Sequence, residues 1–177
     1  RVLPELPSQF DATIIVDAST HVLFEKLAAA NKFSVISSKP SIVLDHHAEV
    51  EKPLDFATVS VVDAGVASTG DLIYSLADSL GWKINPTAAE HLMMSILGDT
   101  QGLTNELTTA NTYRTMASLT ELGADRPKLE ELRREYGKMA PKIYTYKADL
   151  INNTIFEADG RVASVTINQA ELNEFSP

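Results

Sequence analysis

Residues 41–50, SIVLDHHAEV, constrain the fold more than any other stretch of the chain. The apolar residues 42–44 are typical of a buried parallel strand, and the polar residues Asp45, His46 and His47 follow them directly. Open α/β sheets place their binding and catalytic sites at the carboxyl ends of such strands. The stretch therefore predicts an α/β fold with a chemical site where this strand ends.

A second strand-like run ends in the same way. Residues 13–16 read TIIV, and Asp17 follows them 28 positions before Asp45. This spacing accommodates a strand, a crossover helix and a second, parallel strand. We therefore expect both carboxylates at one edge of the sheet, where they can share a metal site. Asp17 also has a simpler interpretation, as a turn residue or the cap of the next helix.

A third candidate acid follows a predicted core helix. Asn85 and Pro86 form a cap and first-turn pair, and the apolar pattern continues to Leu97. The helix is expected to stop at Gly98. Asp99 comes next, in the turn GDTQGLT, whose glycines leave the chain free to aim the carboxylate.

Composition limits the chemistry that these residues can perform. The sequence contains no cysteine, so a metal ion has to be held by His, Asp, Glu or Asn, which suits Mn²⁺, Mg²⁺, Fe²⁺ or Zn²⁺. The net charge of −9 argues against a long nucleic acid duplex as the substrate. No apolar stretch approaches the roughly 20 residues of a membrane helix, and the first residues do not resemble a signal peptide. A cytoplasmic protein with small substrates and no membrane partner is expected.

Five segments, taken in order, resemble the DHH phosphoesterase family: VDAST, VLDHHAEV, ASTGDLIYSLADSLG, SILGDTQGL and TELGAD. Within that family the chain is most similar to the branch of nanoRNases and 3′-phosphoadenosine-5′-phosphate (pAp) phosphatases, which are bifunctional oligoribonucleases. The resemblance implies a parallel-sheet catalytic domain flanked by helices over residues 1–150. It also implies two divalent metal ions, commonly Mn²⁺, with Mg²⁺ as the alternative.

The resemblance also implies a role for each candidate residue. It makes Asp17 a metal-bridging carboxylate, His46 a metal ligand and Asp99 the residue that completes one metal shell. His47 would face the substrate phosphate or assist proton transfer, and Asp45 would hold an imidazole in the correct tautomer. In that family, a metal-activated water attacks the phosphate.

Residues 151–177 are expected to form a terminal β-hairpin and the start of a linker. Residues 153–157 and 161–167 alternate at period two around Ala158-Asp159-Gly160, a strong hairpin signal, and Asn168 caps a short helix. In the family, such a linker leads to a DHHA1-type substrate-binding domain.

That domain has no counterpart in this chain, and neither has the family's first motif, a His followed by an Asp-x-Asp pair. Their absence removes ligands for at least one metal, so we predict that the isolated polypeptide is inactive or nearly so. Loss of the first strand and helix would also expose a sheet edge and apolar surface. A neighbour should cover that surface, and a homodimer is one arrangement that does so.

Three functions remain open from the sequence. The leading one is a metal-dependent hydrolase of short oligoribonucleotides, small nucleotides or cyclic dinucleotides. The second is an inorganic pyrophosphatase or polyphosphatase, because the related family II pyrophosphatases share an Asp-His-His site. The third is a non-catalytic module that binds nucleotides or a protein partner.

Four other polar residues receive ordinary structural interpretations. Ser68 and Thr69 precede a predicted helix and are expected to cap it, with a phosphate contact as the minority alternative. His21 near a helix start and His91 inside the predicted helix of residues 86–97 are not counted as ligands.

Overall fold

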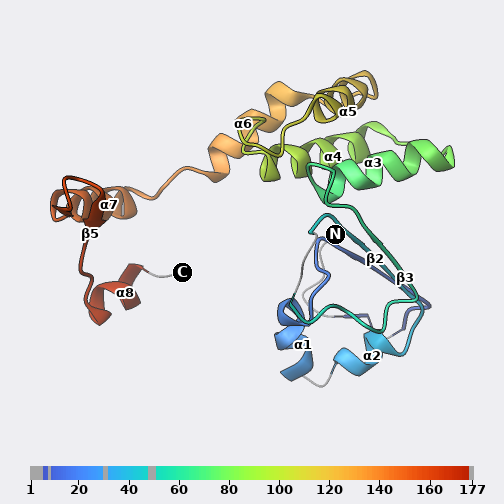
Figure 1. The fold of residues 1–177 in the computed structure, drawn as a ribbon, viewed down its shortest axis with the longest axis horizontal. Coiled ribbons are helices and arrows are strands. Elements are labelled where there is room, and N and C mark those ends of the chain that lie inside the picture. The colour runs from blue at the N-terminus through green and yellow to red at the C-terminus, as the bar shows by residue number, and fades with distance from the viewer. Residues whose placement is uncertain (1–5, 8, 30–31, 48–50, 176–177) are drawn as a thin grey trace. The chain divides into compact units, whose positions relative to one another are not determined.

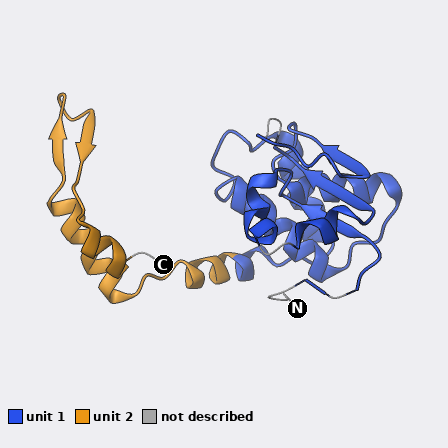
Figure 2. Ribbon diagram, turned by 90° about the horizontal axis from the view of Figure 1, so that it is seen from below, with its two compact units in different colours: residues 1–129 blue, residues 130–177 orange. Residues whose placement is uncertain are grey.

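The computed structural model describes residues 6–7, 9–29, 32–47 and 51–175. The chain divides into two compact units, residues 1–129 and residues 130–177 (Figure 2). The first unit contains the parallel sheet and most of the helices (Figure 1). The sequence analysis expected the catalytic domain to span residues 1–150, whereas the first compact unit ends at residue 129. The extent of the catalytic domain stays a prediction.

The strands of the first unit form a parallel sheet in the order β1-β2-β3. β1 spans Thr13–Val16, β2 spans Ser41–Asp45 and β3 spans Val59–Val62. In the register of the sheet, Val16 pairs with Leu44, so Asp17 and Asp45 follow neighbouring positions at the same edge. The predicted α/β fold, with both acids at one edge, is confirmed.

The two faces of this sheet differ in packing. Ile15 and Val43 lie on one face and form a buried cluster with Ile36 and Leu54. Short helices contribute to this side: η1 (His21–Phe24), α1 (Glu25–Ala29) and α2 (Phe33–Ser37). The opposite face exposes the paired row Ile14, Ile42 and Val59. This row does not test whether a lost strand and helix would expose a sheet edge, and both that expectation and the homodimer stay predictions.

The helical part of the first unit buries its own set of apolar side chains. α3 (Thr69–Leu80), α4 (Pro86–Asp99) and α5 (Ala110–Glu121) pack on one another, and α6 (Arg126–Tyr136) crosses into the second unit. Met93, Ile96, Leu97 and Leu119 are fully buried here. Ser68, Asn85 and Thr109 cap the three helix starts with their side chains, as Ser/Thr/Asn residues do at N-caps.

The second unit contains α7 (Pro141–Asn152), the hairpin strands β4 (Ile155–Glu157) and β5 (Val162–Ser164), and α8 (Gln169–Phe175). The strands pair antiparallel around a turn in which Asp159 and Gly160 have positive φ angles, so the predicted hairpin is confirmed. Tyr146 and Phe175 stack with ring centroids 3.9 Å apart and join α7 to α8. In the described part of the chain, no helix is both long and apolar enough to cross a bilayer.

Candidate metal centre

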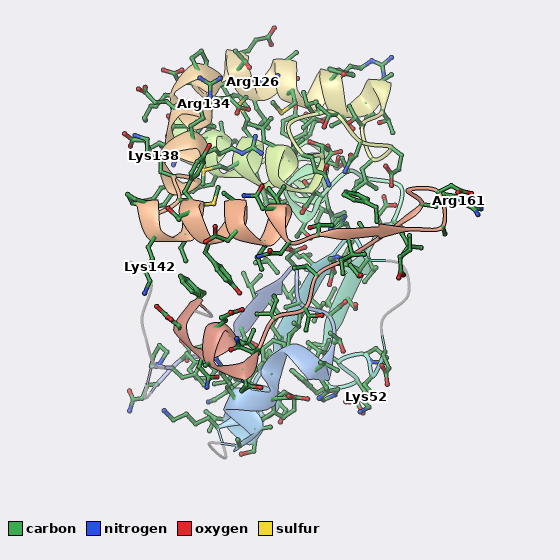
Figure 3. The ribbon with its side chains drawn as sticks, turned by 90° about the vertical axis from the view of Figure 1, so that its left-hand side faces the viewer. Lys52, Arg126, Arg134, Lys138, Lys142 and Arg161 are labelled. Carbon is green, nitrogen blue, oxygen red and sulfur yellow. The ribbon has the colours of Figure 1, made fainter. Side chains whose placement is uncertain are left out.

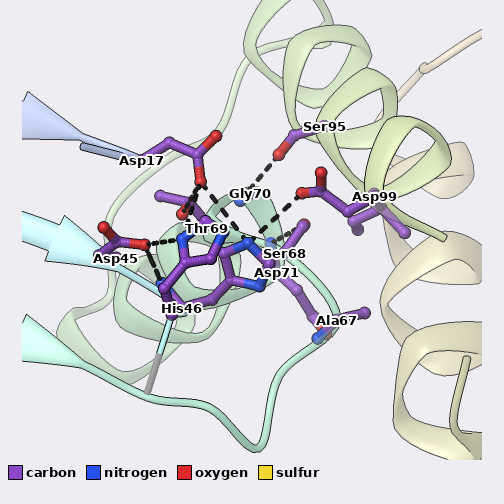
Figure 4. A network of polar contacts seen from close by, with 12 residues as sticks. Asp17, Asp45, His46, Ala67, Ser68, Thr69, Gly70, Asp71, Ser95 and Asp99 are labelled. Atoms are coloured by element: carbon purple, nitrogen blue, oxygen red, sulfur yellow. Dashed lines mark hydrogen bonds and ion pairs between the residues drawn. The ribbon is translucent and has the colours of Figure 1, made fainter. Parts of the chain in front are cut away.

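Asp17 leaves β1 in a conformation that few residues adopt. Its φ angle is 57°, in the left-handed region that Asp tolerates better than most residues because its short side chain can bond locally. Its backbone N–H donates to the carbonyl of Leu44 at 3.0 Å, which ties the turn to the end of β2. The carboxylate is 51% exposed and stands over the sheet edge (Figure 4).

Asp45 is buried, with a side chain only 1% exposed. Its Oδ2 accepts from the backbone N–H of Ser19 at 2.8 Å. Its Oδ1 accepts from the N–H groups of His46 and His47, at 2.7 and 3.0 Å, and from Nδ1 of His47 at 2.6 Å. Burial works to raise the pKa of Asp45, but the bonds from Ser19 and His47 outweigh it and lower that pKa to about 2. Asp45 is therefore ionised, and both of its oxygens accept hydrogen bonds from the protein.

His47 is oriented by the Asp45 carboxylate. Because the ionised Asp45 carboxylate can only accept, Nδ1 of His47 carries the proton, and the Nε2 lone pair of the neutral ring is free. The hydrogen bond to Asp45 raises the pKa of His47 above its usual value, and the charges of Asp17 and Asp99 act in the same direction. The role expected for Asp45, fixing an imidazole tautomer, agrees with this contact.

His46 lies between two carboxylates. Its Nε2 is 3.6 Å from Oδ1 of Asp17 and 3.8 Å from Oδ2 of Asp99, too long for hydrogen bonds (Figure 4). Ligands that share an ion at bond lengths of about 2.1 Å lie about 3–4 Å from one another. The three groups therefore have a spacing that fits one divalent cation, and their O and N donors suit several of these, among them Mn²⁺, Mg²⁺, Fe²⁺ and Zn²⁺.

The wider cluster contains all of the residues singled out at the strand ends. Asp17, Asp45, His46 and His47 offer ligand atoms that lie within 4.8 Å of one another. Since Asp45 is saturated by protein donors, the groups left for an ion are Asp17, His46, Asp99 and the Nε2 of His47. The structure thus brings together every site residue proposed from the sequence, while their catalytic roles stay predictions.

Asp99 reaches this cluster from the end of α4. It is the last residue of α4, so the predicted stop at Gly98 was one residue too early: Thr100 caps the helix, and its N–H still bonds to the carbonyl of Ile96. Burial and the nearby charge of Asp17 raise the pKa of Asp99, and His46 opposes them. Because Asp99 is the last residue of α4, its backbone is fixed by the helix and not by a free turn.

Thr69 contacts the candidate site, although the sequence analysis expected it to cap a helix, with a phosphate contact as the minority alternative. Its hydroxyl donates to Oδ1 of Asp17 at 2.8 Å, across 52 positions of sequence. The capping role belongs to Ser68, whose Oγ accepts from the N–H of Asp71. The signal in the sequence is the run of small residues in ASTG, which allows close approach but does not say to what.

Figure 3 labels basic side chains on several elements, and two of them, Arg126 and Arg134, share α6. Lys52 belongs to the segment between β2 and β3, Arg134 to α6 and Arg161 to the hairpin turn. Others pair with acids: Lys128 contacts Glu90 at 3.0 Å, and Lys142 contacts Glu174 at 2.7 Å.

Comparisons with known proteins give two short sequence matches and several structural matches, of which two are described below. No family model matches the chain. An uncharacterized protein of Mycoplasma genitalium is 32% identical over 94 residues, and its homolog in Mycoplasma pneumoniae is 27% identical over 94 residues. Each match covers 53% of this chain and 28% of the relative, so the matched region is about a quarter of the relatives' length.

One structural neighbour is an exopolyphosphatase-related protein of Bacteroides fragilis. It superposes with a TM-score of 0.76 at 19% identity, over 93% of this chain and 47% of that protein. The two proteins share a fold. A putative family II inorganic pyrophosphatase of Methanococcus jannaschii superposes at a TM-score of 0.48 and 24% identity, over 69% of this chain and 39% of that one. The second superposition is too partial to carry an argument, and the nanoRNase branch stays a prediction.

Proposed function

We propose that this chain is part of the catalytic region of a metal-dependent phosphoesterase that hydrolyses short oligoribonucleotides or small nucleotides. Substrates of this class include pAp and cyclic dinucleotides. The observation that carries the proposal is the placement of Asp17 and Asp99 on either side of His46 Nε2, at 3.6 and 3.8 Å. Beside them stands His47, whose tautomer is set by the buried Asp45.

In this proposal some of the residues are metal ligands and one is a proton-transfer group. Asp17, His46 and Asp99 supply the oxygen and nitrogen ligands that a divalent ion requires. Such an ion, Mn²⁺ or Mg²⁺, supplies Lewis acidity toward a phosphoryl oxygen and makes water a nucleophile at neutral pH. Nε2 of His47 can accept a proton as a base while the ring is neutral, and it can donate to a phosphate oxygen once the ring is protonated. The raised pKa of His47 favours the protonated ring.

The charge of the protein supports small substrates rather than long strands. The net charge is −9, and on α6 the basic pair Arg133-Arg134 stands among three glutamates, Glu130, Glu131 and Glu135. Long nucleic acids are held mainly through many phosphate contacts to Lys and Arg, whereas a small phosphoester needs few. A metal centre supplies the local positive charge that the surface lacks.

Hydrolysis of pyrophosphate or polyphosphate is the second candidate. It is favoured by the shared fold with the exopolyphosphatase-related protein of Bacteroides fragilis. The same ligands serve both reactions, because each is attack of water on a phosphorus centre beside a divalent ion. A module that binds nucleotides or a protein partner without catalysis is the third candidate.

The first test is Mn²⁺ binding to the 177-residue chain by calorimetry. Asp17→Ala and His46→Ala should each abolish it, whereas Asp78→Ala, which removes an exposed acid on α3, should leave it unchanged. No binding by the parent chain, or binding that survives both site substitutions, would overturn the proposal.

Single-turnover assays with the protein in excess then separate the candidates. A diribonucleotide, pAp and inorganic polyphosphate are compared with Mn²⁺ present, because excess protein makes even slow hydrolysis detectable. Preference for the diribonucleotide or pAp supports the leading candidate, and preference for polyphosphate supports the second.

A further inference from the structure

The first turn of α3 touches both carboxylate-bearing elements of the candidate metal centre. Thr69 is 3% exposed and donates its hydroxyl to Oδ1 of Asp17, at the end of β1. Gly70, the next residue, donates its N–H to Oγ of Ser95 on α4 at 3.1 Å. Asp99 lies one helical turn after Ser95 on α4. Two adjacent residues thus reach the supports of two proposed ligands that are 82 positions apart in sequence.

Thr69 donates its hydrogen bond to the Asp17 oxygen that lies nearest His46. Asp17 Oδ1 is the atom that lies 3.6 Å from His46 Nε2, so it is the oxygen that faces a shared ion. Within the described part of the chain, Thr69 is the side chain that donates a hydrogen bond to this carboxylate. A half-exposed Asp without such a bond samples several χ1 rotamers, and a single donor selects one of them. Donors of this kind orient ligands and tune metal affinity.

The turn that carries Thr69 is itself held rigidly. Ser68 is fully buried and caps the helix through the N–H of Asp71. The buried Asp71 carboxylate accepts from the hydroxyl of Thr115 on α5 at 2.8 Å. Thr69 therefore stands on a turn that is bonded to a second helix, and not on a free loop.

Gly70 sets how closely α3 and α4 approach. A Cβ atom at this position would lie 2.6 Å from Cβ of Ser95 and 2.8 Å from the carbonyl oxygen of Leu92. Since the second of these is backbone, the larger residue would push α4 away rather than turn a side chain aside. The displacement would carry Asp99 with it.

We propose that Thr69 and Gly70 are positioning residues: Thr69 fixes the Asp17 carboxylate and Gly70 seats α4 so that Asp99 faces His46. This proposal rests on the proposed function for its meaning, but the orientation of Asp17 can be measured without any metal. Ser68 belongs to the helix cap, so the minority expectation of a phosphate contact there receives no support from its hydroxyl.

The metal-free test uses NMR on Thr69→Val, which keeps the shape and removes the hydroxyl, and on Thr69→Ser, which restores it. The Hα–Hβ couplings of Asp17 should report one χ1 rotamer in the parent and in Thr69→Ser, and averaged rotamers in Thr69→Val. Thr120→Val is the matched control, since its hydroxyl bonds only to the carbonyl of Met116 within α5. Unchanged Asp17 couplings in Thr69→Val overturn the role of Thr69.

The metal-binding test measures Mn²⁺ affinity of the same variants by calorimetry. Thr69→Val is expected to weaken binding roughly tenfold or more, with Thr69→Ser within about threefold of the parent. Gly70→Ala should weaken binding by a comparable factor while leaving the Asp17 couplings unchanged. Equal affinity in Gly70→Ala and parent overturns the role of Gly70. A parent that binds no Mn²⁺ overturns the proposed function and the metal-tuning part of this inference, and the NMR result then decides the orientation of Asp17 by itself.

Discussion

Asp17 and Asp45 lie at the ends of neighbouring parallel strands, but they differ in burial and in the number of hydrogen bonds they accept. Asp45 is 1% exposed, and its two oxygens accept four hydrogen bonds from Ser19, His46 and His47. Asp17 is 51% exposed and receives one side-chain hydrogen bond among the described residues, from Thr69. The comparison teaches that a carboxylate at a strand end becomes a structural anchor or a free ligand according to how many protein donors surround it.

The largest difference is expected in metal binding. Asp17→Asn replaces an ionised oxygen facing His46 with a neutral amide and should lower Mn²⁺ affinity at least a hundredfold, close to loss of measurable binding. The free energy of unfolding should change by less than about 0.5 kcal/mol, because the side chain is half exposed. Calorimetry and urea unfolding measure the two quantities on one sample. If Asp17→Asn binds Mn²⁺ as tightly as the parent chain, Asp17 is not a metal ligand and does not differ from Asp45 in this respect.

Asp45→Asn should have the reverse profile. An amide at this buried position places N–H groups where the carboxylate accepts bonds from Ser19 or His47, so donors face donors. We expect a loss of about 3 kcal/mol in the free energy of unfolding. Urea denaturation followed by circular dichroism measures it. A change below about 1 kcal/mol would show that the hydrogen bonds around Asp45 do not hold the sheet edge together.

Protonation of Asp45 should lower the free energy of unfolding at acid pH. The pKa of this residue is about 2 in the folded protein, below the value near 3.9 of an unfolded chain. A lowered pKa contributes stability that is present above about pH 4 and is lost as the pH falls through about 2, an effect of about 2 kcal/mol. Unfolding measured across this range should show the decline in the parent protein. Asp45→Asn should lack that part of it, and an identical slope in both proteins would contradict this.

The smallest effect concerns the titration of His47. The pKa of its imidazole is raised chiefly by the hydrogen bond that Nδ1 donates to Asp45, and less by the charge of Asp17. Asp45→Asn should therefore lower that pKa toward the ordinary value near 6.5, and Asp17→Asn should lower it less. Imidazole chemical shifts followed against pH by NMR provide the comparison. The opposite order would show that Asp17, and not Asp45, governs His47.

The sequence predicted the elements that local chemistry specifies. The apolar runs before Asp17 and Asp45 predicted parallel strands, and Asn85-Pro86 and Asp159-Gly160 predicted a helix start and a hairpin turn. These signals lie within a few residues of the feature they specify, since caps and turns are local. Convergence of the acids at one sheet edge also followed, because a parallel crossover returns the chain to the same side.

What the sequence could not show depends on contacts between distant segments. The bond from Thr69 to Asp17 and the contact of Gly70 with Ser95 join α3 to β1 and α4, and no local pattern specifies either pair. The extra residue in α4, which puts Asp99 on the helix, follows from the bond between Thr100 and Ile96. Gly98 predicted an earlier stop because glycine usually ends helices in a left-handed conformation, which it does not adopt here.

The measurement that tests the account most directly is anomalous diffraction from crystals soaked in Mn²⁺. The account predicts a manganese peak at about 2.0–2.3 Å from Asp17 Oδ1, His46 Nε2 and an oxygen of Asp99, with Asp45 keeping its bonds to Ser19 and His47. A peak coordinated by Asp45 in place of Asp17, or no peak at this sheet edge at saturating Mn²⁺, would contradict it.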